Sequence, residues 1–482
     1  MPAVAALVTL ALYASTAALP FFSEDLSIQG RVAAYDSVWR IFDPAQIPFR
    51  PLQHGYFCLL VALGPVEPWL ARVPGFALYF LSALLVADLA RQLGCSRRGT
   101  WIALIAYLCF PSIKGIVWVA AINAPGRVTC ILTGLCLFVR HLERPSARTG
   151  IGLLVAQLLA LGFHQAGVVL LPACLLIGWA RGGAPVFRGW ASLVRRLCQP
   201  WLVASFGLAF GYGLAMSFLW SQRYPQSHPA AVLANLARAS LALAPEALRY
   251  PAIEGLRQHW GTRGLVFGLA AVACALLVYL VALLRASVLA RALLLAAGLD
   301  LLLPAVSVGF VVRYGQLAAA LCACAVGLAC DRAAARPRAA RALTAGLAIL
   351  LAGWAYDTAF DVGEYRHAGA VMRRVLGQAA EARARLGPEP SIALVDLPKR
   401  WGRERDIALF DWGTRRALAL RGAPGPWEIL HTKPVASSTE ANLISPEKLE
   451  LLAKERPHAV LVYDAAGERL EEFSGPAHGR DG

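Results

Sequence analysis

Charged side chains are scarce in this sequence, and their scarcity excludes an ordinary soluble protein. Only 16% of the 482 residues are Asp, Glu, Lys or Arg, whereas 58% are hydrophobic and the mean hydropathy is +0.55. A soluble core does not need so much apolar surface, and these values are typical of chains that cross a bilayer repeatedly. The composition therefore predicts a polytopic α-helical membrane protein.

Metal-binding and disulfide patterns are missing from the sequence. The eleven cysteines fall almost entirely in apolar segments, none of them in a CxxC pair, and there is no HxxH or HExxH. We interpret the cysteines as small core residues. We therefore predict no metal-ligand residues and assign no cofactor; a divalent cation is left open, without support from any ligand spacing.

A basic nucleic-acid-binding surface is missing too. The net charge is +16, but the arginines recur in short clusters between apolar runs, without interleaved aromatic residues. The N-terminus, MPAVAALVTL, also lacks the basic residues that precede the apolar run of a cleaved signal peptide. We therefore predict a retained first span, with a membrane rather than a nucleic acid as the partner.

The sequence does contain a long series of apolar runs. A helix needs about 20 apolar residues to cross the hydrocarbon of a bilayer. By that measure we predict about eleven spans, near residues 3–20, 73–90, 100–117, 125–140, 151–164, 166–180, 201–220, 264–284, 289–307, 314–330 and 342–358.

Arginine-rich loops alternate with these spans and predict the orientation. Five basic loops fall on one side: Arg91, Arg97 and Arg98; Arg140, Arg144 and Arg148; Arg181, Arg188, Arg195 and Arg196; Arg285 and Arg291; and Arg332, Arg336, Arg338 and Arg341. Basic loops stay in the cytoplasm. We therefore predict a multi-pass protein of the plasma (inner) membrane with a cytoplasmic N-terminus and long outer loops at 21–72 and 221–263.

After residue 358 the long apolar runs end, and charged and apolar residues are mixed. A charged helical run is followed by SIALVDLP and HAVLVYD, which read as buried strands. We predict a transmembrane domain over 1–358 and a soluble outer α/β domain over 359–482, which is long enough to fold on its own. No nucleophile with a matching base is recognisable in this second domain.

Acidic residues next to or within the apolar runs are the first candidates for function. The stretch FFSEDLSIQG places Glu24 and Asp25 side by side just past the first span, either as a solvated helix exit or as a site. Asp300 lies nine residues beyond Arg291, or about 13 Å into the membrane. A charged, lipid-facing carboxylate there costs about 2.5 to 3.5 kcal/mol, so we expect Asp300 to face the bundle, paired or protonated.

Several short motifs follow these acids in a fixed order. They are FRPL at 49–52, Gly64 with Pro68, Phe110 and Pro111 with Trp118, FHQAGVVLLP at 163–172 and GFVVRYGQ at 309–316. Together with the acidic first outer loop, this order resembles the GT-C superfamily of membrane glycosyltransferases, in particular the relatives of dolichyl-phosphate-mannose protein mannosyltransferases. The resemblance covers about residues 1–360 and implies a GT-C-like fold for the transmembrane domain.

The resemblance also implies an activity. Such enzymes move a sugar from a polyprenyl-phosphate donor to an acceptor hydroxyl at the outer face, usually with inversion. Asp25 matches the first-loop acid of the family and would be the general base, with Glu24 as the alternative or a supporting group. The acceptor is open: a glycolipid, a polysaccharide or a protein.

Basic and polar residues take the remaining roles that the resemblance implies. Arg50, followed by Pro51, and Arg313 with Tyr314 would bind the donor phosphate, and interfacial anchoring is the alternative for both arginines. The cavity around the sugar would include three further residues, His54, His164 and Gln165. Lone histidines are more often satisfied core or turn residues, which is the alternative for these positions.

The sequence departs from the family pattern at three places. Lys114 stands where many members have an acid, the second outer loop AINAPGRVT has no carboxylate, and His164 and Gln165 replace the usual Lys-Glu pair. The departures leave the second-loop acid or metal ligand of the family unassigned, and the missing second-loop acid favours a non-catalytic scaffold as one competing interpretation. A transporter or lipid flippase is another, although neither inverted repeats nor matching broken spans are recognisable.

Overall fold

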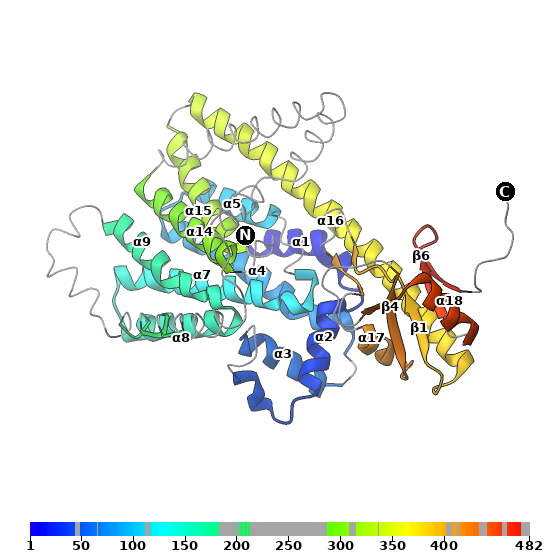
Figure 1. Ribbon diagram of the computed structural model, residues 1–482. Helices are drawn as coiled ribbons and strands as arrows, with labels where there is room; N and C mark the ends of the chain where they lie inside the picture. Colours follow the sequence, from blue (N-terminus) through cyan, green and yellow to red (C-terminus); the bar gives the residue numbers. More distant parts are fainter. Residues whose placement is uncertain are drawn as a thin grey trace.

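The described part of the computed structural model is mostly helical, with one small sheet domain (Figure 1). It comprises residues 1–43, 49–64, 66–110, 116–182, 287–307, 315–335, 337–401, 407–410, 414–432, 441–455 and 460–473, together with 200, 203–205, 207–209 and 211–212. The predicted spans 201–220 and 264–284, the outer loop 221–263, and Arg313 with Tyr314 lie wholly or largely outside these residues.

Every other predicted span falls on a helical segment. In chain order these are α1 (Pro2–Tyr13) with η1 (Ala14–Thr16), α4 (Pro68–Gln92), α5 (Arg97–Cys109), α7 (Asn123–Glu143), α8 (Ala147–Phe163), η4 (Gln165–Val169) with α9 (Leu170–Gly182), α14 (Val288–Ser307), α15 (Gln316–Ala333) and α16 (Pro337–Leu386). Shorter helices lie between them: α2 (Ser23–Ala33), η2 (Val38–Phe42), α3 (Pro51–Ala62) and η3 (Val119–Ile122).

Four helices of the described chain are long and apolar enough to cross a membrane. They are Pro68–Gln92, Val119–Glu143, Gln316–Ala333 and Leu343–Leu386. Three further apolar helices are shorter, over Pro2–Ala11, Ala147–Phe163 and Gln165–Arg181. The described helices therefore support membrane integration, while the number of eleven spans stays a prediction.

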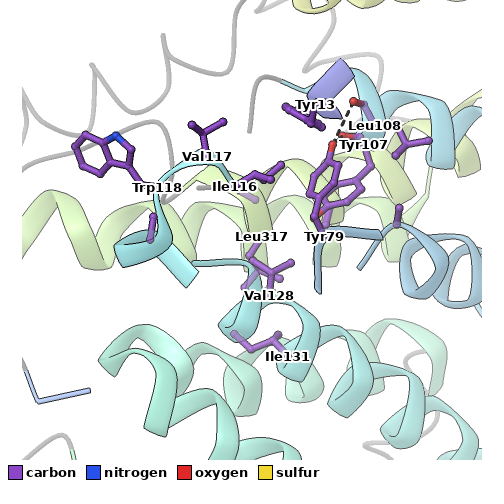
Figure 2. Close-up of a cluster of buried hydrophobic side chains, with 14 of the residues drawn as sticks. Tyr13, Tyr79, Tyr107, Leu108, Ile116, Val117, Trp118, Val128, Ile131 and Leu317 are labelled. Atoms are coloured by element: carbon purple, nitrogen blue, oxygen red, sulfur yellow. Dashed lines mark hydrogen bonds between the residues drawn. The ribbon is translucent and has the colours of Figure 1, made fainter. Parts of the chain in front are cut away.

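Three tyrosines pack together in the core of the helical bundle, one pair stacked and the other edge-on. Tyr79 packs against Tyr13 and Tyr107, with ring centroids 5.6 and 5.4 Å away, and its hydroxyl donates to the carbonyl of Leu108 at 3.2 Å. Figure 2 shows this cluster beside the segment that carries Val117 and Trp118. Because the tyrosine hydroxyl finds an acceptor inside the core, the large ring is buried without a polar penalty.

Residues at four of the five basic loops are linked by contacts between helix ends. Arg140, at the end of α7, binds Asp88 near the end of α4 at 2.6 Å. Arg181, at the end of α9, binds Glu143 at 3.0 Å. Asp331 lies at the end of α15 and accepts two hydrogen bonds from Ser96, the residue directly before α5. The backbone N–H of Ser96 donates at 2.6 Å and its hydroxyl at 2.5 Å.

Asp300 faces the bundle and is paired. Its Oδ1 lies 2.5 Å from Nη1 of Arg127 on α7, and the two side chains are 0% and 2% exposed. The expectation of an inward-facing, paired carboxylate is confirmed. Arg127 received no role from the sequence, because its distance of 173 positions from Asp300 leaves no local signal of the pairing.

The sheet domain has five strands in the order β5-β4-β1-β6-β7. They are β1 (Ile392–Val395), β4 (Trp427–His431), β5 (Ala441–Leu443), β6 (Val460–Asp464) and β7 (Arg469–Glu472), and only β7 runs antiparallel to its neighbour. A separate pair, β2 (Arg400–Trp401) and β3 (Ile407–Ala408), and the helices α17 (Thr414–Leu420) and α18 (Pro446–Glu455) complete the described domain. The predicted strands in SIALVDLP and HAVLVYD are β1 and β6.

The bundle and the sheet are joined by one helix and by one core. α16 runs without a break from Pro337 to Leu386, through residue 358, and extends from the bundle to the sheet (Figure 1). Its Gln378 accepts from the backbone N–H of Leu470 at 2.8 Å. Tyr365 of α16 packs edge-on against Phe22 ahead of α2, with centroids 5.6 Å apart. The described structure therefore has no linker between its two parts.

We predict that the buried pair makes its two partners dependent on each other. Arg127→Met leaves the Asp300 carboxylate buried without its cation, which destabilises a fold by about 3 to 5 kcal/mol. Arg127→Met combined with Asp300→Leu removes both charges and should recover most of that loss. Thermal unfolding of the purified protein in detergent measures both effects.

The matched control for this pair is the half-exposed pair of Arg140 and Asp88. Because Arg140 is 54% exposed, Arg140→Gln should change stability by less than about 1 kcal/mol. If Arg127→Met and the double variant lose the same amount of thermal stability, the two side chains do not depend on each other and the interpretation is contradicted.

Candidate functional site

The candidate site begins where the first apolar run ends. Phe22 is extended and precedes α2, and the carboxylate of Asp25, three residues on, accepts the backbone N–H of Phe22 at 3.0 Å. An acidic residue in the first turn also interacts favourably with the helix dipole. The sequence S-E-D therefore begins α2 and at the same time fixes the position of Asp25.

Asp25 is completely buried rather than solvated. Its exposed fraction is 0%, and its other oxygen, Oδ1, accepts the backbone N–H of Ala120 in η3 at 2.6 Å. Burial raises the pKa of Asp25 to about 6, although Arg72 and the two backbone N–H groups oppose the rise and Glu24 adds to it slightly. The group thus changes charge close to neutrality. Glu24 is half-buried beside it.

Arg72 is the cation that accompanies Asp25, and the sequence analysis assigned it no role. It lies in α4 and is only 1% exposed. Its guanidinium donates to the carbonyl oxygens of Val117, Leu19 and Pro20 at 2.7, 2.6 and 2.6 Å. A lone arginine inside the apolar run PWLARVPGFALYF was the signal that could have identified it, because buried charge in such a run needs a partner.

α3 closes the site from the opposite side. Gln53, which is buried, donates its side-chain N–H to the backbone carbonyl of Ala120. The backbone N–H of Ala120 is bound by Asp25, so side chains bind both backbone polar groups of Ala120. Tyr56 donates its hydroxyl to the carbonyl of Ala71 at 2.6 Å, and burial together with Asp25 raises the pKa of that hydroxyl. Asp25, Arg72 and Tyr56 therefore share one electrostatic environment, which α2, α3 and α4 create together.

Arg50 and His54 form the basic part of the site. Arg50 directly precedes α3, is 8% exposed, and its Nε is buried with no hydrogen-bond partner. His54 lies one turn later, with Nδ1 at 3.4 Å from the hydroxyl of Tyr35. Burial, Arg31 and Arg50 lower the pKa of His54 to about 4, so the imidazole is neutral at pH 7. Positive charge at this place is therefore carried by the arginines.

His164 and Gln165 lie at the predicted turn between α8 and α9. The Nδ1 of His164 accepts the backbone N–H of Ala166 at 3.1 Å, so the buried ring caps η4. Gln165 is half-buried. α8 contacts α3, and the preceding residue, Phe163, lines a cleft together with residues of α3. The turn is thus near the basic part of the site. The hydrogen bond from Ala166 to His164 is structural, because it caps η4.

Two clefts adjoin α3. An apolar cleft of about 590 Å³ lies between α3, α4 and the end of α8, lined among others by Pro51, Leu52, Leu81, Ile122 and Phe163. A second cleft of about 670 Å³ lies between α2, α3 and the sheet domain. Asp25, His54 and His164 line neither of these two clefts. Among the described residues, no three His, Cys, Asp or Glu side chains gather in a way that could hold a metal ion.

Of the predicted residues, Asp25 and Glu24 lie on α2, and Arg50 and His54 lie at the start of α3, which contacts α2, while His164 and Gln165 lie at the adjacent end of α8. Arg313 and Tyr314 lie outside the described residues. Comparison with known proteins adds no family: no protein-family model matches the sequence, and no curated protein is similar to it.

We predict that Asp25 supports the fold independently of any chemistry. Asp25→Ala leaves the buried N–H groups of Phe22 and Ala120 without acceptors, which costs about 1 to 3 kcal/mol for each group. Glu24→Ala, at the neighbouring half-buried position, is the control and should cost less than about 1 kcal/mol. Thermal unfolding measures both, and equal stability of wild type and Asp25→Ala would contradict the hydrogen-bonding role.

Proposed function

We propose that the protein is an integral-membrane glycosyltransferase that moves a sugar from a polyprenyl-phosphate donor to an acceptor hydroxyl at the outer face of the membrane. The proposal includes the predicted orientation, with a cytoplasmic N-terminus and the sheet domain outside. The observation that carries it is the buried Asp25, which has a pKa of about 6 and lies near the buried Arg72, on a helix that contacts α3, where Arg50 and Arg31 act on His54. A catalytic base works best when its pKa is near the operating pH.

The proposed chemistry assigns one task to each group. Asp25 takes the proton from the acceptor hydroxyl, using lone pairs that its two hydrogen bonds leave available. The hydroxyl oxygen attacks the anomeric carbon as the bond from that carbon to the phosphate oxygen breaks, with inversion. Arg50, whose Nε lacks a partner, stabilises the charge on the departing phosphate.

The apolar cleft beside α3 supports a lipid-linked donor. Pro51 and Leu52, directly after Arg50, line this cleft, so a chain of isoprenoid units in the cleft would place its phosphate next to Arg50. The burial of Asp25 adds a requirement: the acceptor reaches the carboxylate only when the contact between α2 and η3 opens. Glu24, which is half-buried, is the alternative base.

A transporter remains the second candidate, favoured by the buried Arg127 and Asp300 in the bundle. Charged pairs within spans mark ion or substrate pathways in many transporters. Asp300 is nevertheless held by Arg127 at 2.5 Å, and both side chains are enclosed, which is equally the arrangement of a structural pair. The enzymatic proposal uses more of the observed site, because it accounts for Asp25, Arg50 and the apolar cleft.

The decisive experiment compares sugar transfer by two isosteric variants. Membranes carrying wild type, Asp25→Asn or Glu24→Gln are incubated with radiolabelled polyprenyl-phosphate hexoses and pentoses, and labelled acceptor is counted. Asp25→Asn should lower the rate about 10²- to 10⁴-fold, while Glu24→Gln retains most of it. Full transfer by a stably folded Asp25→Asn variant would overturn the assignment of the base, and transfer lost only in Glu24→Gln would move the role to Glu24.

The pH dependence of transfer supplies an independent prediction. A base must be ionised to accept a proton, and the pKa of Asp25 is about 6. The rate should therefore fall about tenfold per pH unit below pH 6 and stay level above it. Initial rates between pH 4.5 and 8, in the range where the protein remains folded, test this. A rate that is independent of pH across 5 to 7 would contradict titration of Asp25 during turnover.

A further inference from the structure

The cleft between the two parts of the protein has its own chemistry. About 670 Å³ in volume, it is enclosed by α2, α3, the start of α4, α16 and α17. Figure 1 shows α17 beside α2 at this junction. The cleft is therefore assembled only when the sheet domain is packed on the bundle, and it is separate from the apolar cleft beside α3 and α8.

Basic residues dominate the polar lining of this cleft. Arg373 belongs to α16, Arg416 belongs to α17, and Arg421 directly follows α17, whereas Glu67 is the only acidic residue among the described residues of the lining. The rest of the surface is largely apolar and includes Phe21, Leu60 and Met372. A cleft with an excess of positive charge over an apolar floor suits an anion that also carries hydrocarbon.

Two of these arginines have no acidic partner in the described part of the chain. The Nε of Arg416 is buried without a hydrogen bond, and no ion pair is formed there by Arg416 or Arg421. By contrast, Arg374 and Arg385 on α16, outside the cleft, pair with Glu468 and Glu472 at 3.7 and 2.7 Å. The half-buried guanidinium of Arg416 is costly without a partner unless an anion completes it, whereas Arg421 is exposed and open to an anion that enters the cleft.

Arg373 is partly used in holding the cleft together. One of its N–H groups donates to the carbonyl of Ala18 at 3.3 Å, which links α16 to the segment ahead of α2. The remaining N–H groups of its guanidinium are available for a second acceptor. Guanidinium groups bind phosphate through paired N–H donors, so a phosphate oxygen is the acceptor that fits this lining best.

We propose that this cleft binds the acceptor and that the acceptor is a phosphate-bearing amphiphile. The assignment as acceptor rests on the glycosyltransferase function proposed above. Its physical basis is position: Leu26 and Gln29 of α2 line the cleft, and the same helix carries Asp25 in its first turn. A phosphate held by Arg416 and Arg421 would place a neighbouring hydroxyl against α2. Neutral lipids would lack the charge that this lining recognises.

Binding of dodecyl phosphate to the full-length protein in a neutral detergent tests the cleft directly. Arg416→Gln combined with Arg421→Gln should weaken binding at least about tenfold. Arg415→Gln is the matched control, because Arg415 is an exposed residue of the same helix that does not line the cleft. Unfolding temperatures verify that the variants are folded. Binding that is absent in wild type, or lost equally in Arg415→Gln, overturns the site.

Two further ligands in the same binding assay identify the source of the phosphate. Inorganic phosphate should bind at least tenfold more weakly than dodecyl phosphate, because it leaves the apolar floor uncovered. Phosphatidylglycerol in nanodiscs should not displace dodecyl phosphate at equal concentration. Efficient displacement would assign the cleft to bulk anionic lipid and overturn the role as acceptor site.

The same variants separate this inference from the proposed function. Asp25→Asn should bind dodecyl phosphate as wild type does, since its carboxylate lies outside the cleft. Sugar transfer that persists unchanged in the Arg416→Gln, Arg421→Gln variant would overturn the acceptor site while leaving the glycosyltransferase intact. Arginine-dependent binding by a protein that transfers no sugar would overturn the acceptor role and the proposed function, and leave only a phosphate-binding cleft.

Discussion

The arrangement of Arg72 is the constraint on which the candidate site depends. A guanidinium buried in an apolar helix must have its N–H groups satisfied, and here backbone carbonyls of Leu19, Pro20 and Val117 satisfy them. These carbonyls belong to the two segments that lead into α2 and η3. Asp25 then bonds to one N–H in each region, at Phe22 and Ala120. The cation therefore sets the backbone geometry that positions the carboxylate, and it also offsets part of the cost of burying that charge.

The bundle uses buried charge in two different ways. Arg127 and Asp300 form a direct ion pair, with 2.5 Å between Nη1 and Oδ1. Asp25 and Arg72 are each hydrogen-bonded mainly to backbone groups, and they interact with each other by Coulomb attraction without a direct hydrogen bond between them. Asp300 is therefore enclosed with a single cation, whereas Asp25 is bound by two backbone N–H groups and is only influenced by Arg72. In the proposed function, the chemistry is for this reason assigned to Asp25 and a structural role to Asp300.

Local patterns in the sequence predicted most of the elements and the inward orientation of Asp300. The apolar runs coincide with helices, and SIALVDLP and HAVLVYD form strands, because span length and burial leave local signals. The partners could not be predicted. Arg127 and Asp300 are 173 positions apart, and Asp25 reaches Ala120 over 95 positions. The burial of Asp25 was missed for the same reason: the segment that covers it is remote, so an acidic pair after a span looks solvated.

The unbroken α16 ties the sheet mechanically to the bundle. At 1.5 Å per residue a helix of 50 residues is about 75 Å long, more than twice the roughly 30 Å of hydrocarbon. The excess forms a stalk that carries one wall of the cleft, while α2 and α3 carry the other. Because α16 is continuous through residue 358, we expect a tilt of this helix in the bilayer to move the sheet with it. The width of the cleft would then depend on the thickness of the bilayer around α16.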